Sequence, residues 1–323
     1  MLYSAPYLRD RTKMTADPFS DILKFTKAVS LVTGGFTAGG PWAIRFPPPD
    51  KIKFFAVVKG GCWASIDGEG APIRFETGDV GLLTAKRAFV LSSDPELAPI
   101  DAMSVFSGAG TAAPALGDGK DFAHIGGHVL LDPTSGRLLA DALPPWLHVQ
   151  ASSPQASNFR WLLERLVEEG ADSLPGAKLV SEQLSQLLFI QILRAHLKTS
   201  GSMPAGWLRT LADPRLAPAL HLMHGAPARA WRLEELAHAC AMSRTTFAAN
   251  FKARSGQTPL AYLAEWRMRL ARRSLQEENM PVSVVADLLG YTSESAFSNA
   301  FKRMTGQSPT SYRKISRVTA GQG

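Results

Sequence analysis

The spacing of apolar residues changes along the chain and predicts different secondary structure in each part. Residues 15–30 carry apolar positions at helical spacing, among them Ile22, Leu23 and Phe25. From about residue 29 the pattern becomes a series of short β-prone runs separated by Gly, Pro and Asp. The predicted strands are 29–36, 42–46, 54–58, 62–66, 73–75, 80–83, 89–91 and 100–106. Short strands at this spacing predict a sandwich or a small barrel.

After the Pro-Pro pair at 144–145 the apolar spacing becomes helical again. Phe159, Leu162 and Leu166 form one stripe, and the helix predicted over 178–198 is apolar on more than one face. A helix with so wide an apolar surface needs cover from two sides. One side can pack on the barrel and the first helix. The other side packs either on the same helix of another subunit or on the C-terminal domain of the same chain.

Residues 231–313 contain one helix-turn-helix pattern twice. In the second copy a helical apolar pattern is broken at Gly290, and Ser293 can cap a new helix. A shift of fifty residues superimposes the landmark residues of the two copies. The matched pairs are Phe247 and Phe297, Phe251 and Phe301, Gly256 and Gly306, Pro259 and Pro309, and Tyr262 and Tyr312. Ala237 lies forty-nine residues before Ala286, so the second copy has one extra residue at its turn.

The helix after each turn has an outward face opposite its two phenylalanines. In the first copy this face carries Arg244, Thr245, Ala248, Ala249 and Lys252. In the second copy it carries Glu294, Ser295, Ser298, Asn299 and Lys302. Small and polar side chains flanked by cations are typical of a helix that enters the major groove of DNA. A solvated surface helix carries similar residues, but their repetition in register favours DNA binding.

Between the copies, residues 259–276 predict one continuous helix with Leu263, Trp266 and Leu270 on its apolar side. Eighteen residues at about 1.5 Å each span about 27 Å. This length is close to the roughly 34 Å between successive major-groove faces of B-DNA. Such a helix would hold two recognition helices about one turn apart on the same side of a duplex.

These residues resemble the DNA-binding domain of the AraC/XylS family of bacterial transcriptional regulators over residues 207–313. The motif residues are Gly290, Tyr291, Ser295, Ala296, Phe297, Ala300, Phe301, Lys302, Arg303, Gly306, Gln307, Ser308, Pro309, Tyr312 and Arg313. The resemblance implies promoter binding through both helices. Two features depart from the family pattern, because Ala248 and Ala249 are smaller than usual and Glu294 is an acid near the expected DNA surface.

Helical faces and resemblance together assign a role to each predicted contact residue. Phosphate contacts are expected from Arg244, Lys252, Arg272, Lys302 and Arg303. Base contacts are expected from Thr245, Ala248, Ala249, Ser295, Ser298 and Asn299.

The N-terminal strands resemble the cupin-type domain that precedes the DNA-binding domain in one branch of this family. The resemblance covers about residues 17–150. Its motifs are Gly78-Asp79, residues 42–47, Gly61-Cys62-Trp63 and residues 91–95. Metal-binding cupins hold their ion with histidines, yet residues 1–123 contain none. We therefore expect no metal, no cofactor and no enzyme activity.

An organic effector is the alternative occupant of this domain. The aromatic residues that could line its pocket are Trp42, Phe46, Phe54, Trp63 and Phe89. Each of them would serve equally as an ordinary core residue.

The basic excess of the chain lies in its C-terminal part. Residues 201–323 hold 16 Lys and Arg against 8 Asp and Glu, a net charge of +8, and residues 1–200 hold 19 against 20, a net charge of −1. A basic C-terminal part matches a phosphate-binding surface. Cys62 and Cys240 are far apart, and no apolar stretch is long enough to span a membrane, so we expect a cytoplasmic protein. Met1 and Met14 are both candidate starts.

The predicted architecture is a two-domain α+β chain. It comprises a cupin-like β-barrel sensor (15–150), a helical dimerisation and linker region (151–200), and an all-α DNA-binding domain (203–316) with helix-turn-helix motifs at 232–253 and 281–303 joined by the helix at 259–276. The partners expected are promoter DNA, a small-molecule effector, RNA polymerase and a second copy of the chain. The sequence leaves the effector, the target promoters and the choice between activation and repression open. The alternatives are a cupin-type enzyme or small-molecule binder with a non-specific basic half, and an architectural DNA binder.

Overall fold

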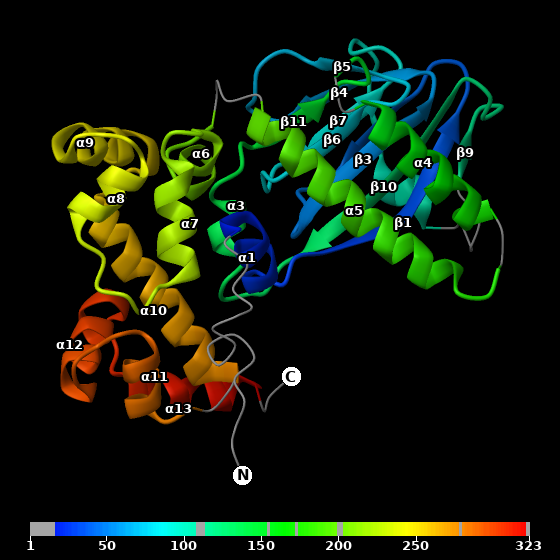
Figure 1. The fold of residues 1–323 in the computed structure, drawn as a ribbon. Helices are drawn as coiled ribbons and strands as arrows, with labels where there is room; N and C mark the ends of the chain where they lie inside the picture. The colour runs from blue at the N-terminus through cyan, green and yellow to red at the C-terminus, as the bar shows by residue number, and fades with distance from the viewer. Residues whose placement is uncertain are drawn as a thin grey trace. The chain divides into compact units, whose positions relative to one another are not determined.

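The computed structural model divides the chain into two compact units (Figure 1). One unit spans residues 25–204, and the other combines residues 1–24 with residues 205–323. The structure describes residues 17–107, 114–153, 156–171, 174–198, 203–277 and 280–320. The linker predicted at 199–202 and both candidate start residues lie outside these ranges. The first described element is helix α1 (Pro18–Phe25), which confirms the amphipathic helix predicted there.

Two β-sheets form the N-terminal unit, where the sequence predicted a barrel. Helix α2 (Ala102–Phe106) follows strand β8, and the short helix α3 (Arg137–Ala140) precedes β11. The six-stranded sheet has the order β11-β6-β3-β10-β1-β9 and the five-stranded sheet the order β5-β4-β7-β2-β8. The strands are β1 (Val29–Ala38), β2 (Ala43–Phe46), β3 (Ile52–Lys59), β4 (Gly61–Ile66), β5 (Ile73–Glu76), β6 (Val80–Leu83), β7 (Phe89–Ser92), β8 (Ile100–Asp101), β9 (Ala115–Leu116), β10 (Phe122–Leu130) and β11 (Trp146–Val149).

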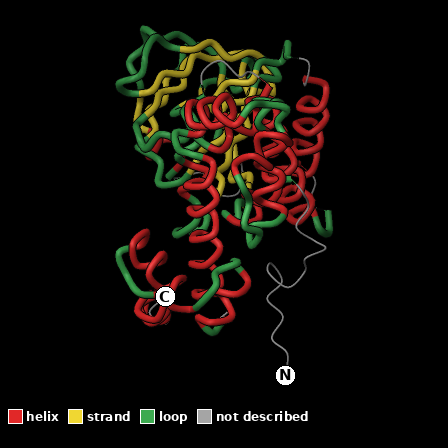
Figure 2. The backbone as a smooth tube through the Cα atoms, turned by 60° about the vertical axis from the view of Figure 1, so that its left-hand side comes forward, coloured by secondary structure: helices red, strands yellow, loops and turns green. Residues whose placement is uncertain are grey.

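An apolar core lies between the two sheets. It joins residues of the six-stranded sheet, such as Phe36 and Phe55, to residues of the five-stranded sheet, such as Ile44 and Phe75. Along β4, buried and half-buried positions alternate, as expected for a strand with one face on the core. Figure 2 shows the strands of this unit in yellow.

Two long helices cover the other face of the six-stranded sheet (Figure 1). They are α4 (Ala156–Ala171) and α5 (Ala177–Lys198), which pack on each other and on β1, β3 and β11. The Gln186 amide fixes α5 to β1, because its Oε1 accepts from the N–H of Ser30 (2.9 Å) and its Nε2 donates to the carbonyl of Ala28 (3.0 Å). The two helices predicted after the barrel are confirmed.

The structure corrects the predicted strands at two places. The run predicted as a strand over 100–106 is a two-residue strand followed by helix α2, because the Asp101 carboxylate accepts from the N–H of Met103 (2.7 Å) and caps that helix. Strands β9, β10 and β11 were not predicted. β10 is the more consequential omission, since it pairs with both β1 and β3 inside the six-stranded sheet.

Every secondary-structure element among the described residues from 205 onward is a helix. These helices are α6 (Trp207–Ala212), α7 (Ala217–Gly225), α8 (Leu233–Ala239), α9 (Arg244–Ser255), α10 (Pro259–Glu277), α11 (Val282–Leu288), α12 (Glu294–Thr305) and α13 (Pro309–Ala320). The two predicted helix-turn-helix motifs are α8–α9 and α11–α12, and the predicted connecting helix is α10.

The turns of the two motifs differ by one residue, as predicted from the sequence. The N–H of Met242 donates to Ala237 in the first turn and that of Tyr291 donates to Ala286 in the second, both at 3.0 Å. The preceding residue has a left-handed backbone in both copies, with φ of 50° at Ala241 and 76° at Gly290. Ser243 follows Met242 directly, whereas Thr292 separates Tyr291 from Ser293. Thr292 is therefore the extra residue.

Gly290 has a second reason to be glycine, since a Cβ there would lie 1.9 Å from the carbonyl oxygen of Ala228 in the α7–α8 loop. Gly306 has a similar φ of 79°, but a Cβ there would meet nothing within 4 Å. We expect Gly306→Ala to lower the free energy of unfolding by about 1 kcal/mol, the strain of the left-handed backbone. Gly290→Ala should lower it by about 3 kcal/mol or more, because the overlap adds to that strain.

Urea unfolding of both variants, followed by circular dichroism at the helix band, measures this difference. Equal losses of stability in the two variants would contradict the close approach of Gly290 to the α7–α8 loop.

Candidate DNA-binding interface

The same capping pattern bounds both second helices of the helix-turn-helix motifs. Ser243 Oγ accepts from the N–H of Thr246 (3.2 Å) at the start of α9, and Ser293 Oγ accepts from the N–H of Ala296 (3.1 Å) at the start of α12. At their ends, Gly256 and Gly306 adopt left-handed conformations that terminate the helices. Each helix is twelve residues long, so the two present surfaces of equal length.

The buried faces of α9 and α12 are also equivalent. Phe247 and Phe251 are fully buried with their ring centroids 5.6 Å apart, and Phe297 and Phe301 repeat both the burial and the distance. In each copy the second phenylalanine meets a tyrosine edge-on, at 5.8 Å in the first and 5.5 Å in the second. The faces opposite these rings are therefore turned to solvent.

The predicted contact residues lie on these outward faces. Ten of them are on the two helices, and their side chains are exposed except at Ala248 and Ser298, which are half-buried. Arg272 differs, because it lies on α10, is half-buried, and has a buried Nε without a hydrogen-bond partner among the described residues. The structure thus brings Arg244, Thr245, Ala248, Ala249 and Lys252 together on α9, and Ser295, Ser298, Asn299, Lys302 and Arg303 on α12.

Helix α10 is unbroken from Pro259 to Glu277 and packs on α9, α11, α12 and α13. Its nineteen residues span about 28 Å at 1.5 Å each. Tyr262, Leu263, Trp266 and Leu270 are buried on one side. The Tyr262 hydroxyl lies 2.8 Å from Nε2 of the buried His224, whose pKa burial lowers to about 3, so that histidine is neutral. α10 is therefore an internal support for both motifs.

Some cations of this unit hold the structure together. Arg267 donates from Nε to the carbonyl of Pro227 (2.6 Å) and from Nη2 to that of Arg229 (2.9 Å), and its guanidinium lies 5.9 Å from the ring of Tyr291. The α7–α8 loop is thus fixed to α10 beside the second turn. Arg313 likewise donates to the carbonyl of Met280 (3.1 Å). The net charge of the region therefore overstates the number of cations available to phosphates.

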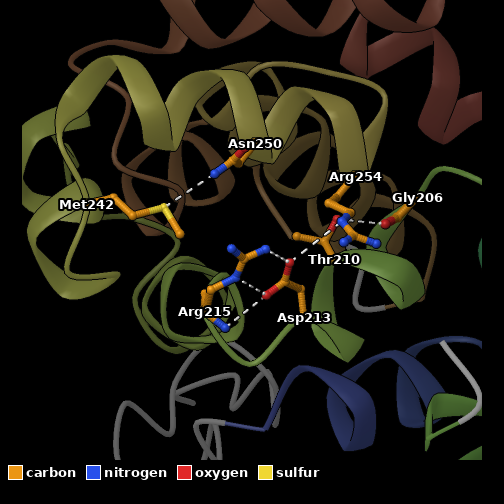
Figure 3. A network of polar contacts seen from close by, with 7 residues as sticks. All are labelled: Gly206, Thr210, Asp213, Arg215, Met242, Asn250 and Arg254. Atoms are coloured by element: carbon orange, nitrogen blue, oxygen red, sulfur yellow. Dashed lines mark hydrogen bonds and ion pairs between the residues drawn. The ribbon is translucent and has the colours of Figure 1, made fainter.

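A buried carboxylate fixes the end of α9 (Figure 3). Asp213 accepts from Nε (3.1 Å) and Nη2 (2.9 Å) of Arg215, and Nε of Arg254 on α9 approaches it to 3.6 Å. The backbone of Arg254 also accepts from the N–H of Gly206 (3.0 Å), and Gly206 in turn accepts from the Thr210 hydroxyl (2.8 Å). The anchor was not predicted, because it is not repeated: Met304 stands at the position of Arg254 in the second copy.

One predicted phosphate contact already has an acidic neighbour. Arg244 Nη1 lies 3.1 Å from the Glu234 carboxylate of α8, and both side chains are more than half exposed. An exposed pair of this kind contributes little to stability. The guanidinium can therefore exchange its partner for a phosphate at small cost.

Comparison with known proteins finds a different family in each part of the chain. The Cupin family matches residues 17–198 and the Helix-turn-helix domain family matches residues 236–315. An AraC-like transcription regulator of Streptomyces lividans is 42% identical over 92% of this chain and 98% of its own. The transcriptional regulator AlkR of Acinetobacter baylyi is 31% identical over 86% of this chain and 92% of its own. The chain belongs to the AraC-like family of transcription regulators.

Among solved structures, the DNA-binding domain of the transcriptional factor AdpA, determined with a target DNA, is 32% identical. It covers 34% of this chain and 99% of its own, with a TM-score of 0.32.

For this member of the AraC-like family, the structure separates the five aromatic residues predicted to line an effector pocket. Trp42, Phe46 and Phe89 belong to or pack against the core between the sheets, and the rings of Phe46 and Phe89 stack at 4.8 Å. Phe54 is buried, but it neighbours Phe55 in the strand and points to the opposite face. Trp63 likewise points away from the core, with the Arg74 guanidinium 5.6 Å from its ring.

Within the described residues there is no group of three or more His, Cys, Asp or Glu arranged to hold a metal ion. None of the described helices is both long and apolar enough to cross a membrane.

Asp213 gives this interface a predicted pH dependence. The Arg215 guanidinium holds the pKa of the Asp213 carboxyl below its ordinary value. A lowered folded-state pKa stabilises the fold above the unfolded pKa, about 3.9, and this contribution is lost as the pH falls through the folded value. We expect Asp213→Asn to lower the free energy of unfolding by about 1 to 2 kcal/mol at pH 7, with a difference from wild type that shrinks below about pH 4.

Denaturant unfolding between pH 3 and pH 7 measures this effect, with the exposed Asp287→Asn as the matched control. If Asp213→Asn and Asp287→Asn gave the same stability at pH 7, the anchoring role of Asp213 would be wrong.

Proposed function

We propose that each chain reads two successive major-groove segments of promoter DNA, one with α9 and one with α12. The observation that carries this proposal is the equivalence of the two helices. They share their length, N-caps, left-handed C-caps and buried phenylalanine pair. Their outward faces carry small and polar side chains flanked by cations, which suit base edges and phosphates respectively.

Each predicted contact residue has a role in this proposal. Arg244, Lys252, Lys302 and Arg303 contact phosphates, with Arg272 as a further cation on α10. Thr245, Ala248, Ala249, Ser295, Ser298 and Asn299 face the bases. Because alanines occupy the centre of the α9 surface, this helix contacts thymine methyl groups and groove shape more than hydrogen-bonding groups. Asn299 makes α12 the more selective of the two helices for hydrogen-bonded bases.

We also infer that the chain acts as a homodimer. Leu179 is 62% exposed and Leu187 is 39% exposed on α5, and Trp161 on α4 is 52% exposed. Large apolar side chains on neighbouring helices are typical of a protein interface. We favour burial of these side chains against a second copy of the chain. The alternative is burial against another part of the same chain.

An effector in the N-terminal unit would modulate DNA binding. Contact with RNA polymerase would then convert the change in DNA binding into a change in transcription. This regulator works by binding in the cytoplasm, without catalysis. The relatives named above support this assignment, since both are transcription regulators.

Selection of the full-length protein against random duplex DNA at near-physiological salt tests the proposal. We expect the bound pool to contain two short elements centred about 10 base pairs apart. Salt-sensitive binding without any recovered motif would contradict the proposal and favour an architectural DNA binder.

Asn299→Ala provides a sharper test, because the two elements serve as controls for each other. If the Asn299 amide makes a bidentate contact with adenine, its loss removes about 1 to 3 kcal/mol of discrimination at one or two base pairs. We expect the element read by α12 to lose that preference while the element read by α9 is recovered unchanged. Equal preference in the wild-type and variant pools would remove Asn299 from the reading surface.

A further inference from the structure

The first residue of each recognition helix carries the opposite charge in the two copies. Arg244 follows the capping Ser243 at the start of α9, and Glu294 follows the capping Ser293 at the start of α12. Both side chains are exposed. The two helices agree in length, caps and buried rings, so the fold presents an acid and a cation in equivalent places.

The partners of these two residues also differ. Arg244 Nη1 lies 3.1 Å from the carboxylate of Glu234 on α8. The shift of forty-nine residues that relates α8 to α11 puts Ser283 at the position of Glu234, and a serine carries no charge to balance Glu294. Among the described residues, the Glu294 side chain has no hydrogen-bond or ion-pair partner. Its carboxylate is therefore available to a partner outside the chain.

The second motif has no cation close to Glu294 along the chain. Residues 281–301 contain two acids, Asp287 and Glu294, and no lysine or arginine. The equivalent residues of the first copy, 232–251, contain two arginines and two glutamates. The first cation after Glu294 is Lys302, about 12 Å further along α12 at 1.5 Å per residue. The cations of α12 that meet phosphates thus lie at the opposite end of the helix from Glu294.

Two roles are compatible with an exposed acid at this place. An acid in the first turn stabilises a helix, because the helix N-terminus carries a partial positive charge. An acid with this role alone would repel phosphates and weaken the binding of every DNA sequence. In helix-turn-helix proteins, however, the N-terminal residues of the second helix contact base edges in the major groove. Glu294 occupies that part of α12, so its carboxylate can meet a donor on a base.

The donors of the major groove identify the base. Cytosine presents its N4 amine there, whereas adenine presents its N6 amine beside the acceptor N7. An ionised carboxylate has acceptors only, so it is repelled by the adenine N7. Cytosine has no acceptor on this edge, and it is the base whose donor a glutamate fits.

We propose that Glu294 selects a cytosine in the DNA element read by α12, by accepting a hydrogen bond from the N4 amine. This inference rests on the proposed function and names a base pair that the second element requires. Asn299 lies five residues further along the helix, about 7.5 Å at 1.5 Å per residue. The required C·G pair therefore lies about two base pairs from the pair that Asn299 reads.

Selection of the full-length protein and of Glu294→Ala against random duplex DNA tests this inference. The element read by α12 is the one whose preference changes in Asn299→Ala. We expect the wild-type pool to require a C·G pair in this element, and the Glu294→Ala pool to lose that requirement while the other element is recovered unchanged. A wild-type element without the C·G pair, or a requirement that persists in Glu294→Ala, would overturn the inference.

Affinity for the selected site separates base recognition from charge repulsion. Loss of an acid that only repels phosphates strengthens binding, whereas loss of an acid that accepts from a base weakens it. We expect Glu294→Ala to bind the selected site about tenfold more weakly than the wild type. Asp287→Ala is the matched control, because it removes the other acid of residues 281–301, which is exposed on α11, and it should bind at least as tightly as the wild type. Wild-type or higher affinity in Glu294→Ala would refute the contact.

A change in the DNA locates the contact at the amine. Replacement of the required cytosine by 2-pyrimidinone, which lacks the N4 amine, should weaken binding of the wild type about tenfold more than binding of Glu294→Ala. Equal losses in the two proteins would show that Glu294 does not contact this amine.

Circular dichroism verifies that both variants keep their helices. Failure of this inference is distinguishable from failure of the proposed function. A wild-type pool without two elements would refute the reading by α9 and α12, and the role of Glu294 with it. Two elements whose base preferences are the same in the wild type and in Glu294→Ala would refute the role of Glu294 alone.

Discussion

A pair of phenylalanines four residues apart decides which face of each recognition helix reaches the solvent. Burial of Phe247 with Phe251, and of Phe297 with Phe301, fixes the rotation of α9 and α12 about their own axes. The residues on the opposite face are then exposed whatever their chemistry. DNA recognition depends on this packing, since a rotated helix would present other side chains to the groove. The repeated tyrosine contact with the second ring makes the constraint equal in both copies.

This constraint is local, so the recognition faces could be predicted from the spacing of residues. The supports of these faces could not, because they join residues that are distant in sequence. Asp213 reaches α9 through Arg254, and Arg267 meets the carbonyls of the α7–α8 loop. The net charge counted Arg267 as a free cation, whereas the fold uses it to hold a loop. Gly290 was predicted as a helix break, but its close approach to Ala228 depends on tertiary structure.

In the N-terminal unit, the omission of β10 has a physical explanation. Gly126 and Gly127, flanked by histidines, have the composition of a turn. In the fold they belong to a paired strand, and a Cβ on Gly127 would lie 2.0 Å from the carbonyl oxygen of Leu31 and overlap the Phe54 ring. The glycines are required by packing from neighbouring strands, which a single sequence does not reveal.

One continuous helix, α10, supports the two recognition helices of one chain. Affinity for a selected two-element site, before and after insertion of five base pairs between the elements, tests this claim most directly. Five base pairs are about half a helical turn, so the insertion moves one element to the opposite side of the duplex. We expect the affinity to fall to that of a site with a single element. Unchanged affinity would mean that α10 does not hold α9 and α12 in a fixed arrangement on one duplex.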